Sequence, residues 1–155
     1  MRCDSAGFTL MEILVVMALL AAVGSFALFV SADSYRGETF RSDRAALIAA
    51  LQHARAMAMH GVCAGDACTE GAPHGVAIEP DRYVLFQGSK YAARDSREDL
   101  VIPADPAVSH EGLSEVVFAD ASGDAQEAGD ITLTDTAGHA SVITIGLEGQ
   151  IVWTH

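Results

Sequence analysis

The chain is poor in positive charge. Its 155 residues contain 9 lysine and arginine residues against 21 aspartate and glutamate residues, so the formal net charge is -12 at pH 7. A chain with this balance repels a phosphate backbone on average, and its few basic residues are interleaved with acidic ones instead of forming a run. The composition therefore argues against nucleic acid as a partner.

Long apolar runs are also scarce, and the only one lies at residues 8–30, where Glu12 is the single charged residue. A helix of this length extends about 35 Å, and the hydrocarbon core of a bilayer is about 30 Å thick. The sequence therefore predicts a transmembrane or filament-core helix over residues 8–30. An ionisable group in such a segment is costly, so we interpret Glu12 as a functional residue.

Residues 31–60 are expected to form an amphipathic stalk helix. Four apolar residues recur at steps of four, three and four, namely Leu47, Leu51, Ala54 and Ala58. Gly61 is a suitable residue for the end of this helix. No proline separates the segment from the apolar run, so we expect one nearly continuous helix.

Residues 61–155 have the short apolar and β-branched runs of a β-rich head. Residues 74–79 and 82–87 are separated only by Pro80 and Asp81, which predicts a tight hairpin. Residues 88–99 are polar and are expected to form a loop. Further strands are expected over residues 100–102, 115–119, 130–135, 141–146 and 150–155. The apolar face of the helix has to be covered, which predicts an α+β fold with this helix packed on an antiparallel sheet.

Cysteine is limited to Cys3, Cys63 and Cys68. In an exported domain, Cys63 and Cys68 are a possible disulfide pair that closes a small loop. Two thiolates that bind a metal are the alternative, but a zinc site requires four ligands, which His60 and His74 would have to complete. The third alternative is a pair of free thiols.

Three interpretations compete for residues 1–32. A secretory signal peptide would be cut near residues 30–32, but the apolar run is long for such a peptide and the acidic residues fit it poorly. A plain single-span anchor leaves Glu12 unexplained, and arginines on both sides of the run do not define an orientation. The third interpretation comes from a resemblance.

The segment "GFTLMEILVVMALLAAVG", at residues 7–24, resembles the class III signal of type IV pilins and type II secretion pseudopilins. The resemblance implies that residues 1–7 are a leader, which prepilin peptidase removes by cutting between Gly7 and Phe8. It also implies N-methylation of Phe8 and a role for Glu12 in assembly. A carboxylate one helical turn from the new amine, on the same chain or on the next subunit, can pair with it.

The resemblance continues more weakly into the helix and the first hairpin. Residues 44–61 and 74–88 are similar to minor pilins and pseudopilins of the GspH/FimT type, with an Ala-Arg-x-x-Ala segment that Ala54, Arg55 and Ala58 match. Gly75 and Tyr83 lie where the hairpin would require them. The implied fold is a lollipop, with a helical stalk and an α+β head of antiparallel strands.

Other clusters of functional residue types give weaker signals. Asp120, Ser122 and Asp124 alternate like the ligands of a calcium loop, but Ala125 and Ile131 stand where such a loop requires glycine and glutamate, which favours a solvated turn. Two helical histidines, His53 and His60, are too few for a metal site. Serine and histidine neighbours in the chain lack a supporting motif, so we expect no enzymatic activity and no cofactor.

These observations together favour a minor pilin or pseudopilin subunit of a type IV pilus or type II secretion filament. The implied partners are other pilin or pseudopilin subunits, prepilin peptidase and the inner-membrane assembly platform. The resemblance places the unassembled subunit in the inner membrane by a single span, with its head in the periplasm or outside the cell. The alternatives are a DNA-uptake minor pilin and an exported soluble or anchored binding domain.

Overall fold

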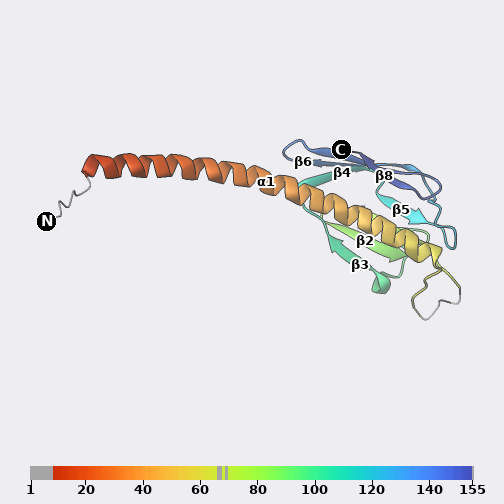
Figure 1. Ribbon diagram of the computed structural model, residues 1–155. Coiled ribbons are helices and arrows are strands. Elements are labelled where there is room, and N and C mark those ends of the chain that lie inside the picture. Colours follow the sequence, from red (N-terminus) through yellow and green to blue (C-terminus); the bar gives the residue numbers. More distant parts are fainter. Residues whose placement is uncertain (1–8, 66–67, 69, 155) are drawn as a thin grey trace, which may run out of the picture. The chain divides into compact units, whose positions relative to one another are not determined.

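The computed structural model describes residues 9–65, 68 and 70–154, apart from the side chains of residues 26–36. A long helix, α1 (Leu10–Met59), precedes all the described strands (Figure 1). The chain divides into two compact units, Met1–Gly37 and Glu38–His155. The second unit contains the last part of α1 and the strands β1 (His74–Glu79), β2 (Arg82–Gln87), β3 (Leu100–Pro103), β4 (Val108–Gly112), β5 (Glu115–Phe118), β6 (Gly129–Asp135), β7 (Ala140–Ile145) and β8 (Ile151–Thr154).

The strands form two antiparallel sheets, with the orders β3-β2-β1-β5 and β4-β6-β7-β8. The predicted hairpin is confirmed, because β1 and β2 are paired as far as Glu79 and Arg82, which flank the turn at Pro80 and Asp81. The predicted α+β fold is also confirmed, although the strands are divided between two sheets instead of one.

Strand β4 is the element that the sequence did not predict. Its residues, "VSHEG", contain one buried apolar side chain, that of Val108, and therefore lack an apolar alternation. The strand is defined by its pairing with β6, in which Val108 lies opposite Asp135. Because β4 joins the second sheet, β5 returns to the first and β6 joins the second again, the chain crosses between the sheets three times.

The end of α1 is set by Gly61, as predicted. Gly61 has a φ of +58°, a left-handed conformation that glycine adopts without steric cost. Its amide donates to Ala58 O at 3.1 Å, and the amide of Val62 donates to Met57 O at 3.0 Å. This pair of bonds is a Schellman motif, which satisfies carbonyl groups that the helix leaves without partners.

The main core lies between α1 and the two sheets. The four residues of the predicted helix face, Leu47, Leu51, Ala54 and Ala58, are all completely buried. They belong to one apolar cluster with residues of both sheets, among which are Val76, Leu85, Phe118, Ile131, Leu133, Ile143 and Ile145. The last part of α1 is therefore the common layer on which both sheets pack.

The other face of the first sheet is buried as well. Ala77, Val84, Phe86 and Val117 form a second apolar cluster, against which Tyr91 packs. Tyr91 belongs to the segment of residues 88–99, which contains the short 3-10 helices η1 (Tyr91–Ala93) and η2 (Ser96–Glu98). The predicted polar loop thus covers this sheet face, which explains the unbroken apolar run within β2.

Candidate functional site

The first turn of α1 contains a capping box between Thr9 and Glu12. The Glu12 amide donates to Thr9 Oγ1 at 3.3 Å, and the Thr9 amide donates to Glu12 Oε2 at 3.4 Å. With Thr9 as the N-cap, Glu12 occupies the third helical position, where a carboxylate also complements the helix dipole. The Glu12 side chain is exposed, so its carboxylate is held at the surface of the helix start. Gly7 and Phe8 lie outside the described residues.

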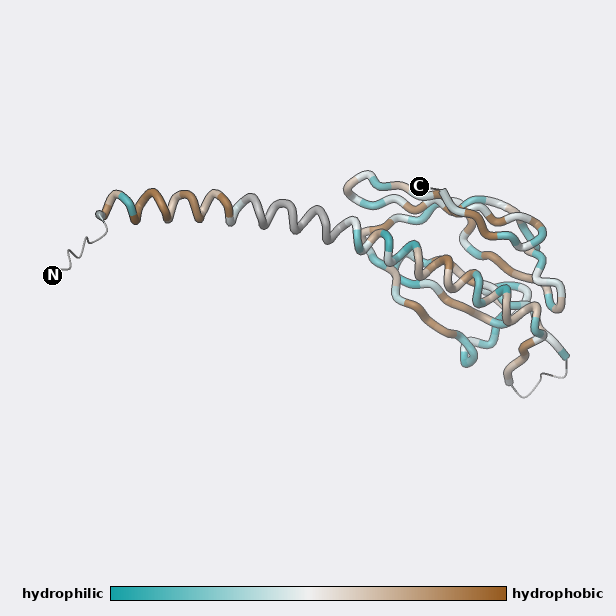
Figure 2. Tube along the Cα trace, viewed as in Figure 1, coloured by the Kyte–Doolittle hydropathy of each residue, from teal (hydrophilic) through white to brown (hydrophobic). Residues whose placement is uncertain are grey.

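The helix surface after Glu12 is apolar on all sides. Figure 2 shows hydrophobic residues following one another along this part of α1. Over residues 13–25 all of them are exposed within the chain, among them Leu14, Met17, Leu20 and Val23. A helix that is apolar all round is stable only when a membrane or other chains cover it. Among the residues that the structure describes, no helix combines the length and the hydropathy needed to span a bilayer.

A buried polar cluster joins α1 to both sheets. The Tyr83 hydroxyl donates to Asp43 Oδ2 at 2.6 Å and lies 2.6 Å from His110 Nε2. Because the single phenolic proton is directed at Asp43, His110 Nε2 is the donor to the Tyr83 oxygen. The Asp105 amide donates to Asp43 Oδ1 at 2.9 Å. The sequence pattern predicts Tyr83 in the hairpin but gives no signal for Asp43 and His110, which lie far from it in the chain.

Arg55, from the Ala-Arg-x-x-Ala segment, connects the helix to two loops of the head. Its Nε donates to Gly123 O at 3.2 Å, and its guanidinium also donates to Glu148 O at 2.8 Å. Ala54 and Ala58 of the same segment face the core. The segment therefore has a structural role in fixing the loop positions over the end of α1.

The structure joins Cys63 and Cys68 by a disulfide, which is the pairing expected for an exported head. Their Cα atoms are 5.8 Å apart, a typical separation for a disulfide. The side chain of Gln87, at the end of β2, accepts from the Ala64 amide at 2.7 Å and donates to Ala64 O at 3.1 Å. Gln87 thereby attaches the disulfide loop to the first sheet.

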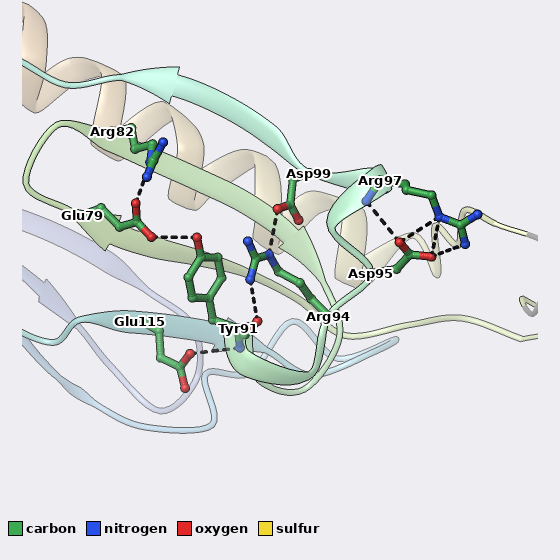
Figure 3. Close-up of polar contacts among 8 residues, drawn as sticks. All are labelled: Glu79, Arg82, Tyr91, Arg94, Asp95, Arg97, Asp99 and Glu115. Carbon is green, nitrogen blue, oxygen red and sulfur yellow. Dashed lines mark hydrogen bonds and ion pairs between the residues drawn. The ribbon is translucent and has the colours of Figure 1, made fainter.

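Charged side chains hold the segment of residues 88–99 against the first sheet (Figure 3). The Tyr91 hydroxyl donates to Glu79 Oε1 at 2.7 Å, and its amide donates to Glu115 Oε2 at 3.0 Å. The Arg94 guanidinium lies over the Tyr91 ring and donates to Asp99 Oδ2 at 2.7 Å. These contacts of Tyr91 are all within this chain.

The calcium candidates Asp120, Ser122 and Asp124 lie in the turn after β5. Within this turn, the Asp124 amide donates to Ser122 Oγ at 3.2 Å, and the Ser122 amide donates to Asp120 O at 2.7 Å. Asp120 Oδ1 is buried, and no described residue forms a hydrogen bond with it. The described residues contain no group of three or more histidine, cysteine or acidic side chains placed to hold a metal ion.

The histidines have different environments. His53 and His60 are exposed, whereas His74 at the start of β1 is buried. His74 Nδ1 lies 2.9 Å from Ala72 O and donates to it, which leaves Nε2 as a buried acceptor without a described partner. Burial lowers the pKa of His74 from its usual value, although Ala72 and Asp120 favour its charged form.

Comparison with known proteins identifies the start of the chain. Residues 2–28 match the family model described as the prokaryotic N-terminal methylation motif. This class III signal is consistent with a type IV pilin-like protein or a pseudopilin. No curated protein and no solved structure matches the chain.

Proposed function

We propose, from the N-terminal methylation motif at residues 2–28, that this chain is the precursor of a minor pilin or pseudopilin in a type IV pilus or type II secretion filament. Prepilin peptidase removes residues 1–7 by cutting between Gly7 and Phe8, and Phe8 is then N-methylated. The single observation that carries this proposal is the match to the motif. An apolar helix that none of the described residues covers supports it, because such a helix needs a membrane or other subunits around it.

Glu12 has two successive roles in this proposal. In the precursor its carboxylate closes the capping box with Thr9 and helps to start α1. Cleavage creates a positive amine on Phe8, and the carboxylate then pairs with this amine on the same chain or on a neighbouring subunit. Such a pair lowers the cost of both charges in an apolar environment and fixes the stagger between subunits.

The proposed partners follow from the same motif. They are other pilin or pseudopilin subunits, prepilin peptidase and the inner-membrane assembly platform. Before assembly, residues 8–30 anchor the subunit in the inner membrane, and in the filament they pack against the same segment of other subunits. The head lies in the periplasm or outside the cell and makes lateral or tip contacts. The role is structural, not enzymatic.

The first test is the N-terminus of the mature protein, measured by mass spectrometry in cells with an active prepilin peptidase. The proposal requires a chain that begins with N-methylated Phe8. A chain that begins near Asp33 would instead identify an exported domain released by ordinary signal peptidase. An intact Met1 would leave an anchored protein that is not processed.

The second test separates the two roles of Glu12. Glu12→Gln keeps a side chain that can close the capping box but removes the negative charge. Thr9→Ala removes the N-cap and keeps the charge. We expect Glu12→Gln to abolish incorporation into filaments, whereas Thr9→Ala permits it. Equal loss in both variants would show that the helix start, and not the charge, is what assembly requires.

A further inference from the structure

Strand β8 presents unpaired backbone groups along one side. It lies at the edge of the second sheet and, among the described strands, pairs with β7 alone, with Ile145 opposite Ile151 and Ile143 opposite Trp153. Gly146 N donates to Gln150 O at 3.0 Å, so these two opposite residues form a hydrogen-bonded pair. Hydrogen-bonded and non-hydrogen-bonded pairs alternate along antiparallel strands, so the two pairs named above are not hydrogen-bonded. It follows that the N–H and C=O groups of Ile151 and Trp153 point away from β7, toward the free edge.

The β8 edge lacks the devices that usually prevent strand addition. Exposed edges are commonly protected by charged side chains, proline or bulges. Strand β3 ends in Pro103, and β4 contains Glu111 and ends at Gly112, whose φ is +106°. On β5, the edge away from β1 is partly occupied by a bridge between Phe118 and Ala125. The sequence of β8, "IVWT", contains no charge, proline or glycine.

Both faces of β8 carry exposed apolar side chains. Trp153, opposite the buried Ile143, lies on the core side and is 43% exposed, and Val152 lies on the outer side and is 54% exposed. On the core side, a groove of about 290 Å³ separates the strand from α1 and is lined by Gln52, Arg55, Ala56, Met59 and Ile151. An added strand would therefore find apolar contacts on both of its faces.

The charge of this half of the head restricts the partner. No lysine or arginine occurs after Arg97, whereas acidic residues continue through the second sheet and its loops. Two copies paired through β8 would bring these acidic regions together, and repulsion between them opposes that pairing. A strand flanked by positive charges would instead be attracted.

We propose that β8 is a docking edge for an extended strand of a different, positively charged protein. The strand adds to the second sheet beside β8, and its backbone bonds to the free N–H and C=O groups of Ile151 and Trp153. Its side chains are β-branched or aromatic, and lysine or arginine residues flank it. This contact involves the head alone, so it does not depend on the processing or assembly proposed above.

The test uses the full-length protein in detergent solution and a synthetic peptide of alternating valine and threonine with lysines at both ends. Trp153 is the only tryptophan, so its fluorescence reports directly on this edge. We expect the peptide to shift the Trp153 emission and to slow amide hydrogen exchange at Ile151 and Trp153. The amides of Val152 and Thr154 already point to β7, so their exchange changes little.

Two comparisons test the mechanism. Replacing the lysines of the peptide by glutamates should weaken binding about tenfold at low salt, with a smaller difference at high salt. Trp153→Ala keeps the outward N–H, whereas Trp153→Pro removes it, so the proline variant should bind the peptide about fivefold more weakly than the alanine variant. Both variants lack the fluorescent side chain, so the slowing of exchange at the Ile151 amide measures their binding. Slow exchange at the Val152 amide in both variants verifies that β8 remains paired.

Three results would overturn the proposal. Unchanged exchange at Ile151 and Trp153 with saturating peptide would show that the edge takes no strand. Equal affinity for the lysine and glutamate peptides would contradict the charge of the partner. Protection of the same two amides that rises with protein concentration, without peptide, would identify a second copy as the occupant.

Discussion

The hydroxyl of Tyr83 donates a hydrogen bond to Asp43 Oδ2 at 2.6 Å and thereby joins β2 to α1 across 40 residues of chain. Both residues are buried. Burial by itself raises the pKa of Asp43, but the nearby His110 imidazole, the Tyr83 hydroxyl and the Asp105 amide outweigh this effect and lower it. A charged carboxylate thus ties the last part of α1 to β2.

Tyr83→Phe should remove this bond and leave the Asp43 carboxylate with one buried donor fewer. We expect the free energy of unfolding to fall by about 2 kcal/mol, since bonds to charged groups contribute more than neutral ones. Urea denaturation of the full-length protein in detergent measures the loss. The matched control is Tyr91→Phe, which deletes a hydroxyl that bonds to the more accessible Glu79 and should cost less than about 1 kcal/mol. Equal losses of unfolding free energy in the two variants would show that the buried bond contributes no more than the accessible one.

Gly75→Ala should disrupt the contact between β1 and its neighbours. A Cβ atom at this position would lie 2.7 Å from Val116 O, a backbone atom of β5, and 2.6 Å from Phe86 Cζ. Neither strand can move without loss of pairing, so we expect a loss of about 2 kcal/mol in the free energy of unfolding. Gly37→Ala in α1 is the control, because a Cβ there has no neighbour within 4 Å. The thermal midpoint of unfolding measures this loss. A Gly75→Ala variant with the same midpoint as the wild type would contradict the close packing around Gly75.

His74 should make the stability of the head depend on pH. Burial lowers its pKa in the folded chain, so near pH 6 the unfolded chain binds a proton that the folded chain does not. The stabilising contribution is therefore complete above the unfolded pKa of 6.5 and is lost as the pH falls below it. His74→Asn, which retains a donor for Ala72 O, should flatten the pH dependence of unfolding between about pH 5 and 7. An equal pH dependence of unfolding in His74→Asn and in the wild type would contradict the role of His74. The control is His60→Asn, at an exposed site.

Removal of the disulfide should destabilise the head without unfolding it. Cys63 and Cys68 close a short loop, for which chain entropy predicts a contribution of about 2 kcal/mol. The double variant Cys63→Ala/Cys68→Ala should show this loss in urea denaturation. Ala64 keeps its bonds to Gln87, so β1 and β2 should keep their pairing, which amide exchange can verify. Cys3 is the third cysteine of the full-length chain. Labelling of three thiols in the untreated, unfolded full-length protein, instead of Cys3 alone, would show that no disulfide forms.

The sequence by itself determined the long helix, its end at Gly61 and most of the strands. These features depend on local signals, which are an apolar period along one helix face, a glycine that accepts a left-handed conformation and a two-residue turn between β1 and β2. The methylation motif is likewise a contiguous pattern, so residues 2–28 could be interpreted without a structure. The pairing of Cys63 with Cys68 was one of three alternatives that the sequence left open.

Only the tertiary structure decided how the strands divide between two sheets. Strand β4 has little apolar character of its own and forms because β6 supplies hydrogen-bond partners along its length. In the same way, Asp43, Tyr83 and His110 come from three separate elements and meet only when both sheets pack on α1. The free edge of β8 also emerges at this level, since an edge exists only once the order of strands is established. Contacts between distant segments leave no periodic trace in the chain, and for that reason they had to be found in the folded head.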